Sequence, residues 1–400
     1  MKKNVFLICL LSLSLLLSTA FGEALPVSGQ TVTMPRTTYE KFQEEAFVLE
    51  MMDLIQNEFV DDVSRKDLME AATAGMLESL EDPYTFFYEP EQFAQMWEDD
   101  EGAYGGLGIL INTNYKTDKS TVIRIFTGSP AEQAGVQRGD IIYKVEDLLV
   151  NASNINDAVS IMRGEPGTDV HVIFLRDGEE VPLTMTRAIV NQTRVEWTMI
   201  DGDIGYICVY EFAGDCSEKF RAAMEELKAK NARGYILDLR DNPGGWTQDA
   251  EIMADVFLDG GLIYTVQYRD GTREESKAKS GCLDVPLVIL VNENSASSSE
   301  ILSGALQDRI GAVIVGVKTF GKGIIQGVVP IGQEGAGMQL TVAQYFTPNG
   351  HAVHGIGITP DVVVELPEEH DGLYNFADLK DPQLKKAVDI MQEKLAGAGK

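Results

Sequence analysis

The chain has 400 residues, of which 44% are hydrophobic and 24% are charged, and its formal net charge is −29. This length provides for two or three domains with a substantial core. Such a negative charge argues against binding of the nucleic-acid phosphate backbone, which requires clusters of Lys and Arg. We therefore expect a multidomain globular protein whose partners are not nucleic acids.

The first 22 residues are predicted to be a secretory signal peptide. Lys2 and Lys3 precede an apolar run from Val5 to about Leu17, and Ala20-Phe21-Gly22 offers a cleavage site. The run is short for a transmembrane span, and an uncleaved membrane anchor remains the alternative. Cleavage would remove two lysines and no acids, changing the charge from −29 to about −31. We expect a protein that is secreted or held in the cell envelope, outside the cytoplasmic membrane.

Residues 23–98 are predicted to be a helical segment. Apolar residues recur at helical spacing between Thr38 and Val60, and Ser64 is a candidate N-cap of a second helix ended by Asp82-Pro83. The aromatic residues that follow, between Tyr84 and Phe93, are interpreted as core packing. Two helices of this size can barely bury their own apolar faces, which predicts docking or dimerisation.

Residues 99–190 resemble a PDZ domain in composition and in the order of their elements. A short helix is expected at Ser129–Gly135, a longer one at Ile155–Arg163, and a closing hairpin around Asp177-Gly178. Within this order, the segment G-L-G-I would offer backbone N–H groups to a peptide's terminal carboxylate, and the next strand would pair with the peptide. Taken alone, the same glycines would indicate only an ordinary turn. The peptide-binding candidates are Gly106, Leu107, Gly108 and Ile109.

Arg163 ends the longer PDZ helix and carries a weaker hypothesis. We expect it to signal occupancy of the peptide site to the remainder of the protein.

Residues 191–367 are predicted to be a layered α/β core, and residues 368–400 a C-terminal helical segment with a helix near 380–396. Helices near 217–230 and 248–257 alternate with apolar runs, a pattern typical of such folds. The buried-strand candidates are Ile204–Tyr210, Tyr235–Leu239, Leu262–Val266, Leu287–Val291 and Ala312–Val317.

The sequence D-L-R-D-N-P-G-G follows the second of these strands. Its Gly244 and Gly245 can present N–H groups to a developing oxyanion, together with the N–H of Ser298. The loop is also a Pro-Gly turn. Its charged residues, Asp238, Arg240 and Asp241, are interpreted as a structural ion-pair set.

The stretch from Val291 to Gln326 carries the chemistry. A buried strand runs into N-S-A-S-S-S-E, so that Ser297 lies at a strand-to-helix turn, where N–H groups favour negative charge. Lys322 and Gln326 follow in F-G-K-G-I-I-Q, and in an extended segment both face the same side. No histidine is near in sequence, so burial by Phe320, Ile324 and Ile325 would lower the pKa of Lys322 and make it a base. Gln326 would orient the amine.

The structural alternative is that Ser297-x-x-Glu300 is only a helix capping box. The lysine segment and the glycine loop favour the catalytic interpretation. Ser295, Ser298 and Ser299 are interpreted as structural residues.

Together, N-S-A-S-S-S-E, F-G-K-G-x-x-Q, D-L-R-D-N-P-G-G, the PDZ-like module and the late G-I-G-I-T-P-D resemble the carboxyl-terminal processing (tail-specific) proteases. The resemblance implies a serine nucleophile at Ser297, a base at Lys322 and an orienting Gln326. It also implies a crotonase-like α/β core and dimerisation through the N-terminal helices, and it is compatible with an activating partner. Ser298, where the family more often has alanine, and Lys318, where an acid is usual, depart from its pattern.

We therefore predict a secreted serine endopeptidase that binds proteins or peptides with apolar C-termini and cuts near or upstream of those tails, without metal or other cofactor. The alternatives are a catalytically inactive PDZ-type scaffold and, less consistent with a signal peptide, a crotonase-like acyl-CoA enzyme.

The cysteines and histidines suggest no metal site. Cys208 lies in an apolar run and is expected to be a buried thiol, whereas a Cys216–Cys282 disulfide is left open. His351 and His354 lack a third ligand at metal-binding spacing and are interpreted as surface or structural residues.

Overall fold

The computed structural model describes residues 35–101, 103–114, 117–126, 128–332, 335–366 and 376–398. The predicted signal peptide lies outside these residues. The chain divides into two compact units, the first ending at Met76 and the second running from Leu77 to the C-terminus.

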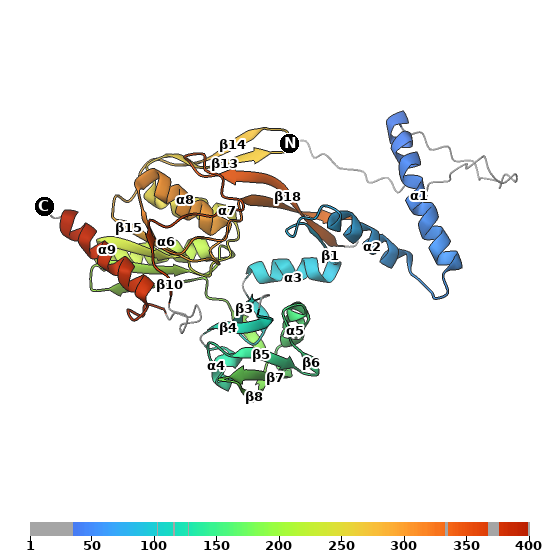
Figure 1. Cartoon of the computed structure of the whole chain (residues 1–400), viewed down its shortest axis with the longest axis horizontal. Coiled ribbons are helices and arrows are strands. Elements are labelled where there is room, and N and C mark those ends of the chain that lie inside the picture. The colour runs from blue at the N-terminus through green and yellow to red at the C-terminus, as the bar shows by residue number, and fades with distance from the viewer. Residues whose placement is uncertain are drawn as a thin grey trace, which may run out of the picture. The chain divides into compact units, whose positions relative to one another are not determined.

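Helix α1 (Arg36–Glu58) and most of helix α2 (Arg65–Glu78) form the described part of the first unit (Figure 1). Ser64 caps α2 as predicted, its Oγ accepting the N–H of Asp67 at 3.0 Å. Large apolar side chains remain exposed on both helices, as expected for a pair too small to cover itself: Phe47, Met51, Leu54, Met69 and Met76. Among the described residues, no helix is both long and apolar enough to cross a membrane.

The second unit contains the predicted PDZ-like domain. Its main sheet has the order β3-β4-β5-β7-β8, with β6 paired to β5. Two helices pack on it, α4 (Pro130–Ala134) and α5 (Ile155–Met162), around a core that includes Val122, Val172 and Phe174. The strands are β3 (Ile109–Asn114), β4 (Lys119–Ile125), β5 (Ile141–Val145), β6 (Leu148–Leu149), β7 (Asp169–Arg176) and β8 (Glu179–Thr186).

Turn chemistry explains the local PDZ structure. Ser129 caps α4, and Gly135 ends it at φ 81°. The β7–β8 hairpin turns at Asp177 and Gly178, whose φ angles of 53° and 85° suit the type I′ turn that the Asp-Gly pair predicts. A two-stranded ribbon of β2 (Ala103–Gly106) and β9 (Ala188–Asn191) brings together the two chain ends of the domain.

The α/β core is built on a six-stranded sheet of order β10-β11-β12-β15-β16-β19. All its neighbouring strands are parallel except the antiparallel pair β10–β11. The strands are β10 (Val195–Ile200), β11 (Ile204–Val209), β12 (Gly234–Asp238), β15 (Leu287–Val291), β16 (Val313–Gly316) and β19 (Val362–Val363). Buried parallel strands need apolar residues on both faces, which is why they appear in the sequence as continuous apolar runs.

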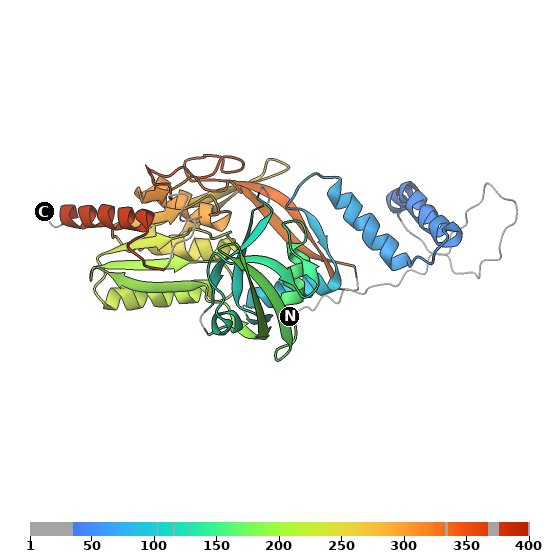
Figure 2. The ribbon, with the colours of Figure 1, turned by 60° about the horizontal axis from the view of Figure 1, so that its bottom comes forward.

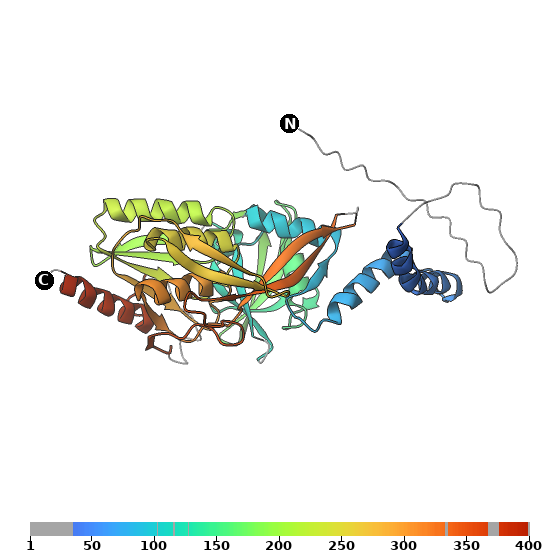
Figure 3. The ribbon, with the colours of Figure 1, turned by 90° about the horizontal axis from the view of Figure 1, so that it is seen from above.

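Helices cover both faces of this sheet. Side chains alternate along β12, so that Tyr235 and Leu237 join one apolar cluster and Ile236 joins the other. Helix α9 (Pro382–Ala398) packs in the second cluster, on the opposite face of the sheet from α6, as Figure 3 shows. The first cluster is covered by α6 (Cys216–Ala229), α7 (Thr247–Phe257) and α8 (Ser298–Ile310).

A second sheet of order β1-β18-β13-β14, with β17 paired to β18, adjoins the core. The predicted strand Leu262–Val266 lies here, in β13, rather than in the parallel sheet, because it pairs antiparallel with β14 and β18. The β17–β18 hairpin reaches β1, next to which lies helix α3 (Pro90–Glu101) (Figure 2). The strands are β1 (Phe86–Tyr88), β13 (Gly261–Tyr268), β14 (Arg273–Ala278), β17 (Ile324–Ile331) and β18 (Ala336–Phe346). The arrangement agrees with the predicted fold class: N-terminal helices, a PDZ-like domain and a mixed α/β core.

Candidate active site

Ser297 lies between β15 and α8 with an unusual backbone conformation. Its φ of 55° and ψ of −116° are sparsely populated by non-glycine residues and cost about 1–3 kcal/mol. Its side chain is half-buried, whereas its neighbours Ser298 and Ser299 are fully buried. Strain of this kind persists only where surrounding contacts hold it, and it is concentrated at functional sites.

The carboxylate of Glu300 supplies the strongest of those contacts. It is fully buried, and its Oε2 accepts the N–H of Ser297 at 3.0 Å and the N–H of Lys322 at 2.8 Å. Its Oε1 accepts Thr319 Oγ1 at 2.5 Å and the N–H of Gly321 at 2.8 Å. Burial raises the pKa of Glu300, and these hydrogen bonds partly oppose that rise. One carboxylate therefore ties the serine turn to the lysine loop.

Tyr345, on β18, joins the same two segments. Its hydroxyl lies 3.1 Å from the carbonyl oxygen of Ser297 and 2.8 Å from that of Lys322, so its proton is shared between them. The side chain is 2% exposed, which fixes the position of this hydroxyl. The backbones of residues 297 and 322 are thus held on both their N–H and C=O sides.

Lys322 has a partly desolvated amine. Its Nζ lies 4.7 Å from the centroid of the Tyr84 ring. Burial lowers the pKa of Lys322, while the nearby Asp82 carboxylate partly opposes this. The pKa of Asp82 is itself lowered because hydrogen bonds from Thr341, Thr85 and the Tyr84 N–H outweigh its burial. The expectation that Phe320 covers the lysine is wrong: Phe320 is 57% exposed, and Tyr84 takes that place.

The glycine loop lies against the serine turn. A Cβ on Gly244 would be 2.6 Å from Ser297 Cβ, and one on Gly245 would be 2.0 Å from the Phe212 carbonyl oxygen. The Gly244 N–H donates to Asn242 Oδ1 at 2.9 Å, so it is not available to an oxyanion in this conformation. In the described part of the chain, the N–H groups of Gly245 and Ser298 have no acceptor. Of the three predicted donors, Gly245 and Ser298 fit that role.

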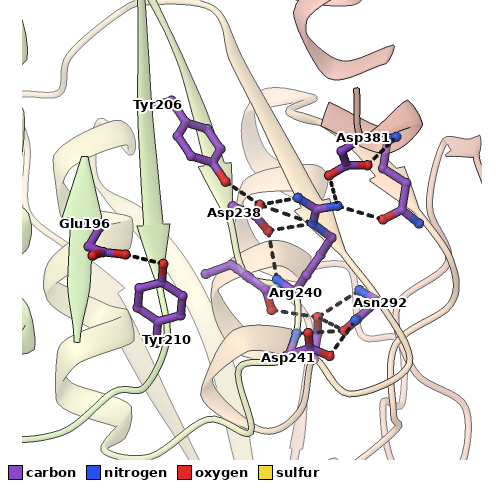
Figure 4. Close-up of polar contacts among 11 residues, drawn as sticks. Glu196, Tyr206, Tyr210, Asp238, Arg240, Asp241, Asn292 and Asp381 are labelled. Atoms are coloured by element: carbon purple, nitrogen blue, oxygen red, sulfur yellow. Dashed lines mark hydrogen bonds and ion pairs between the residues drawn. The ribbon is translucent and has the colours of Figure 1, made fainter. Parts of the chain in front are cut away.

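A buried ion-pair network supports the start of this loop (Figure 4). Arg240 is fully buried and binds Asp238 with Nε at 2.9 Å and Nη2 at 2.6 Å, as the sequence predicts for a structural pair. Its Nη1 lies 2.5 Å from Asp381, just before α9, so the C-terminal segment completes the network. Within the described residues Asp241 makes no ion pair; it accepts hydrogen bonds from the amides of Asn292 and Asn294, 2.8 Å each.

Gln326 lies on β17 after a register shift between Ile325 and itself. Its Nε2 is 3.4 Å from Thr341 Oγ1 on β18. With that nitrogen engaged, the amide oxygen remains for a donor such as an amine.

A cavity of about 730 Å³ brings the predicted residues together. Gly245, Ser297, Lys322 and Gln326 all line it. Its lining also includes Tyr104, Leu110 and Arg163 of the PDZ domain, so one open space joins that domain to the serine.

The predicted peptide-binding residues lie at an edge strand of the PDZ domain. Gly106 ends β2, Leu107 and Gly108 form the loop, and Ile109 begins β3, which among the described strands pairs only with β4. Gly108 has a φ of 77°, and a Cβ there would lie 2.3 Å from Ser129 Cβ, so only glycine fits. Within the described residues, the N–H groups of Leu107 and Gly108 have no acceptor, which suits capture of a carboxylate.

Arg163 directly follows α5, and its guanidinium carbon lies 4.8 Å from the centroid of the Tyr104 ring. Both side chains line the cavity that reaches Ser297.

Sequence reasoning missed four residues of the site: Asp82, Tyr84, Glu300 as a hub rather than a cap, and Tyr345. The capping-box pattern in the sequence pointed to Glu300 as a helix cap. The structure adds that its carboxylate is buried and accepts four hydrogen bonds. The other three had no sequence signal.

The Cys216–Cys282 disulfide left open by the sequence is not formed, since both are free thiols, the first buried and the second exposed. Cys208 is buried, as predicted. Among the described residues, no group of three His, Cys, Asp or Glu side chains could hold a metal ion.

Comparison with known families agrees with this site. The model of peptidase family S41 matches residues 203–364, a PDZ domain model matches 121–176, and the model of the activating protease CtpB N-terminal domain matches 25–92. These matches, together with the site, define a serine-type peptidase with a PDZ domain.

Curated relatives identify the family. The chain is 36% identical to the carboxyl-terminal-processing protease of Synechocystis over 91% of this chain and 87% of that protein. It is 34% identical to carboxy-terminal processing protease CtpA of Bacillus subtilis over 86% of this chain and 74% of that protein. The chain therefore belongs to the carboxyl-terminal processing proteases of peptidase family S41.

Solved structures support the fold. A photosystem II D1 C-terminal processing protease is 28% identical with a TM-score of 0.60, covering 82% of this chain and 96% of that one. An S41 protease from Bacteroides fragilis has a TM-score of 0.57 at 16% identity, over 86% and 97% of the two chains, and supports the fold alone.

Proposed function

We propose that this protein is a secreted or envelope-located serine endopeptidase in which Ser297 is the nucleophile and Lys322 its base. The observation that carries the proposal is that a strained serine and a desolvated lysine, tied by Glu300 and Tyr345, line one cavity. Desolvation favours the neutral amine, the form that can accept a proton.

In the proposed reaction, Ser297 Oγ attacks the scissile carbonyl carbon while its proton passes to the Lys322 amine. The N–H groups of Gly245 and Ser298 would stabilise the resulting oxyanion. The C–N bond then breaks, Lys322 returns the proton to the leaving amine, and an acyl-enzyme remains. Water, deprotonated by Lys322, hydrolyses that ester and frees the serine. Gln326 would orient the lysine by accepting from its amine.

The PDZ domain would select the substrate. A peptide added along the β3 edge, with its carboxylate at Leu107 and Gly108, would have its upstream chain at the cavity that leads to Ser297. Apolar side chains at the C-terminus would pack on the apolar face between β3 and α5. Arg163, stacked on Tyr104 inside the cavity, would report occupancy to the core.

We further propose that the N-terminal helices associate with a second copy, because their apolar faces are exposed and the CtpB N-terminal domain model matches this region. Leu54→Glu should lower the mass measured by light scattering toward that of a monomer, while Gln56→Glu, also exposed, should not. An unchanged mass in both would contradict the proposal. The same match is compatible with an activating partner that binds this region.

The test of the catalytic proposal is cleavage of casein by the mature chain, with Ser297→Ala and Lys322→Ala beside it. We expect cleavage by the parent and a loss of at least about 1,000-fold in each variant. Full activity of Lys322→Ala would refute the base. Binding of an apolar tail peptide by a parent that never cleaves, even with that peptide present, would instead favour the inactive scaffold. Sequencing of the exported protein's N-terminus would test cleavage after residue 22.

A further inference from the structure

Two tryptophans stack on each other in the wall of the active-site cavity. The rings of Trp97, on α3, and Trp246, directly after the glycine loop, have centroids 6.0 Å apart and planes inclined by only 14°. Both line the cavity that contains Ser297 and Lys322. Each still exposes a large part of its side chain, 42% for Trp97 and 39% for Trp246.

The Trp97 ring and the Trp246 backbone are each fixed by contacts within the protein, so this wall is formed before substrate arrives. The backbone N–H of Trp246 donates to the Phe212 carbonyl at 2.6 Å, which fixes the Trp246 backbone beside Gly245. Trp97 packs edge-on against Phe93 at 6.0 Å. Phe93 in turn lies so close to Gly337 of β18 that a Cβ there would meet the ring at 2.1 Å. Helix α3 is thereby fixed to the hairpin that carries Gln326.

Packing alone does not account for the pair. A tryptophan that serves a core is covered, whereas these two are partly exposed and both line an open cavity. Ile301 and Ile324 line the same cavity, so apolar surface borders the reacting groups on more than one side. Pockets of this composition bind apolar side chains.

We propose that Trp97 and Trp246 form a specificity subsite that accepts a bulky apolar side chain of the substrate within two residues of the scissile bond. The subsite must lie near the scissile bond, because Trp246 directly follows Gly245, the proposed oxyanion donor, in the chain. The inference rests on the proposed endopeptidase function. It adds a second selection step, at the bond that is cut, to selection of the C-terminus by the PDZ domain.

The first experiment maps the casein bonds cut by the parent, by Trp246→Ala and by Trp97→Ala, using mass spectrometry. Peptides carrying Leu or Ala at the preferred position then give kcat/KM. We expect the parent to prefer Leu by at least about 10-fold, and each variant to lose that preference mainly through a higher KM for the Leu peptide. Trp197→Phe, which changes a tryptophan bonded to Glu226 on α6, is the control and should behave as the parent. An unchanged preference in both alanine variants would overturn the subsite.

A second measurement does not need turnover. In a Ser297→Ala, Trp197→Phe chain, the emission comes from Trp97 and Trp246 alone, because the sequence has 3 tryptophans. The Leu peptide should shift this emission to shorter wavelength, with a Kd at least about 10-fold lower than that of the Ala peptide. Equal affinity and no shift would contradict the subsite. If the peptide shifts the emission but the parent never cleaves, the subsite holds and the catalytic proposal fails, so the two failures are distinguishable.

Discussion

Replacing Glu300 by Gln is the sharpest test of how the site is held together. The carboxylate accepts four hydrogen bonds in a fully buried position, two of them from the N–H groups of Ser297 and Lys322. Glutamine keeps one acceptor oxygen but places an NH₂ group where the other oxygen was. The two buried groups that donated to that oxygen then face the NH₂ group, which is itself a donor, and no water can replace the missing acceptor.

The cost follows from the number of donors left unpaired. Each buried unsatisfied group costs about 1–3 kcal/mol, and removing a buried charge returns part of this, so we expect the free energy of unfolding to fall by about 2–4 kcal/mol. A fold with a typical stability of about 5–15 kcal/mol would survive this loss. Catalysis should fall by at least about 10-fold, because the serine turn and the lysine loop lose their common support.

The assay combines urea unfolding of the mature chain with kcat/KM measured without urea. Glu293→Gln, an exposed acid four residues before Ser297, is the matched control and should change neither quantity appreciably. If Glu300→Gln unfolds within 0.5 kcal/mol of the parent and cleaves within about 2-fold, the assigned role of the carboxylate is wrong.

Three further predictions follow from the same geometry. The Asp82 carboxylate raises the pKa of Lys322 and so opposes the lowering by burial. In Asp82→Asn, neutral lysine should therefore form at lower pH, and the rising limb of the pH–rate profile should move to lower pH. A shift to higher pH would contradict this. Gly245→Ala should abolish cleavage, because its Cβ would lie 2.0 Å from the Phe212 carbonyl oxygen. The control Gly271→Ala is also at positive φ but in open space, and it should cost only about 1 kcal/mol of stability. Cleavage by both variants would refute the clash. Asp381→Ala should lower the free energy of unfolding by about 3–5 kcal/mol, because it leaves the buried Arg240 half-paired. Asp389→Ala, which breaks an exposed ion pair on the neighbouring α9, should cost less than about 1 kcal/mol; equal losses in urea unfolding would argue against the network.

The sequence alone determined the local structure and the residue types of the site. Continuous apolar runs predicted β11, β12, β15 and β16 because strands buried on both faces carry no polar alternation. Ser64 and the Asp-Gly turn were readable because capping and positive φ are properties of a few neighbouring residues. The nucleophile and base candidates were readable because their motifs stand in a specific order along the chain.

Only the tertiary structure decided what surrounds those residues. The lysine is covered by Tyr84 rather than Phe320, Tyr345 bridges two backbones, and Arg240 pairs with Asp381, 141 residues away. Periodicity reports that a face is buried but not which distant segment buries it, and the strand Leu262–Val266 therefore joined a sheet that the pattern could not distinguish. The pKa shifts and the cavity arise from such long-range contacts, because desolvation and charge act through space rather than along the sequence.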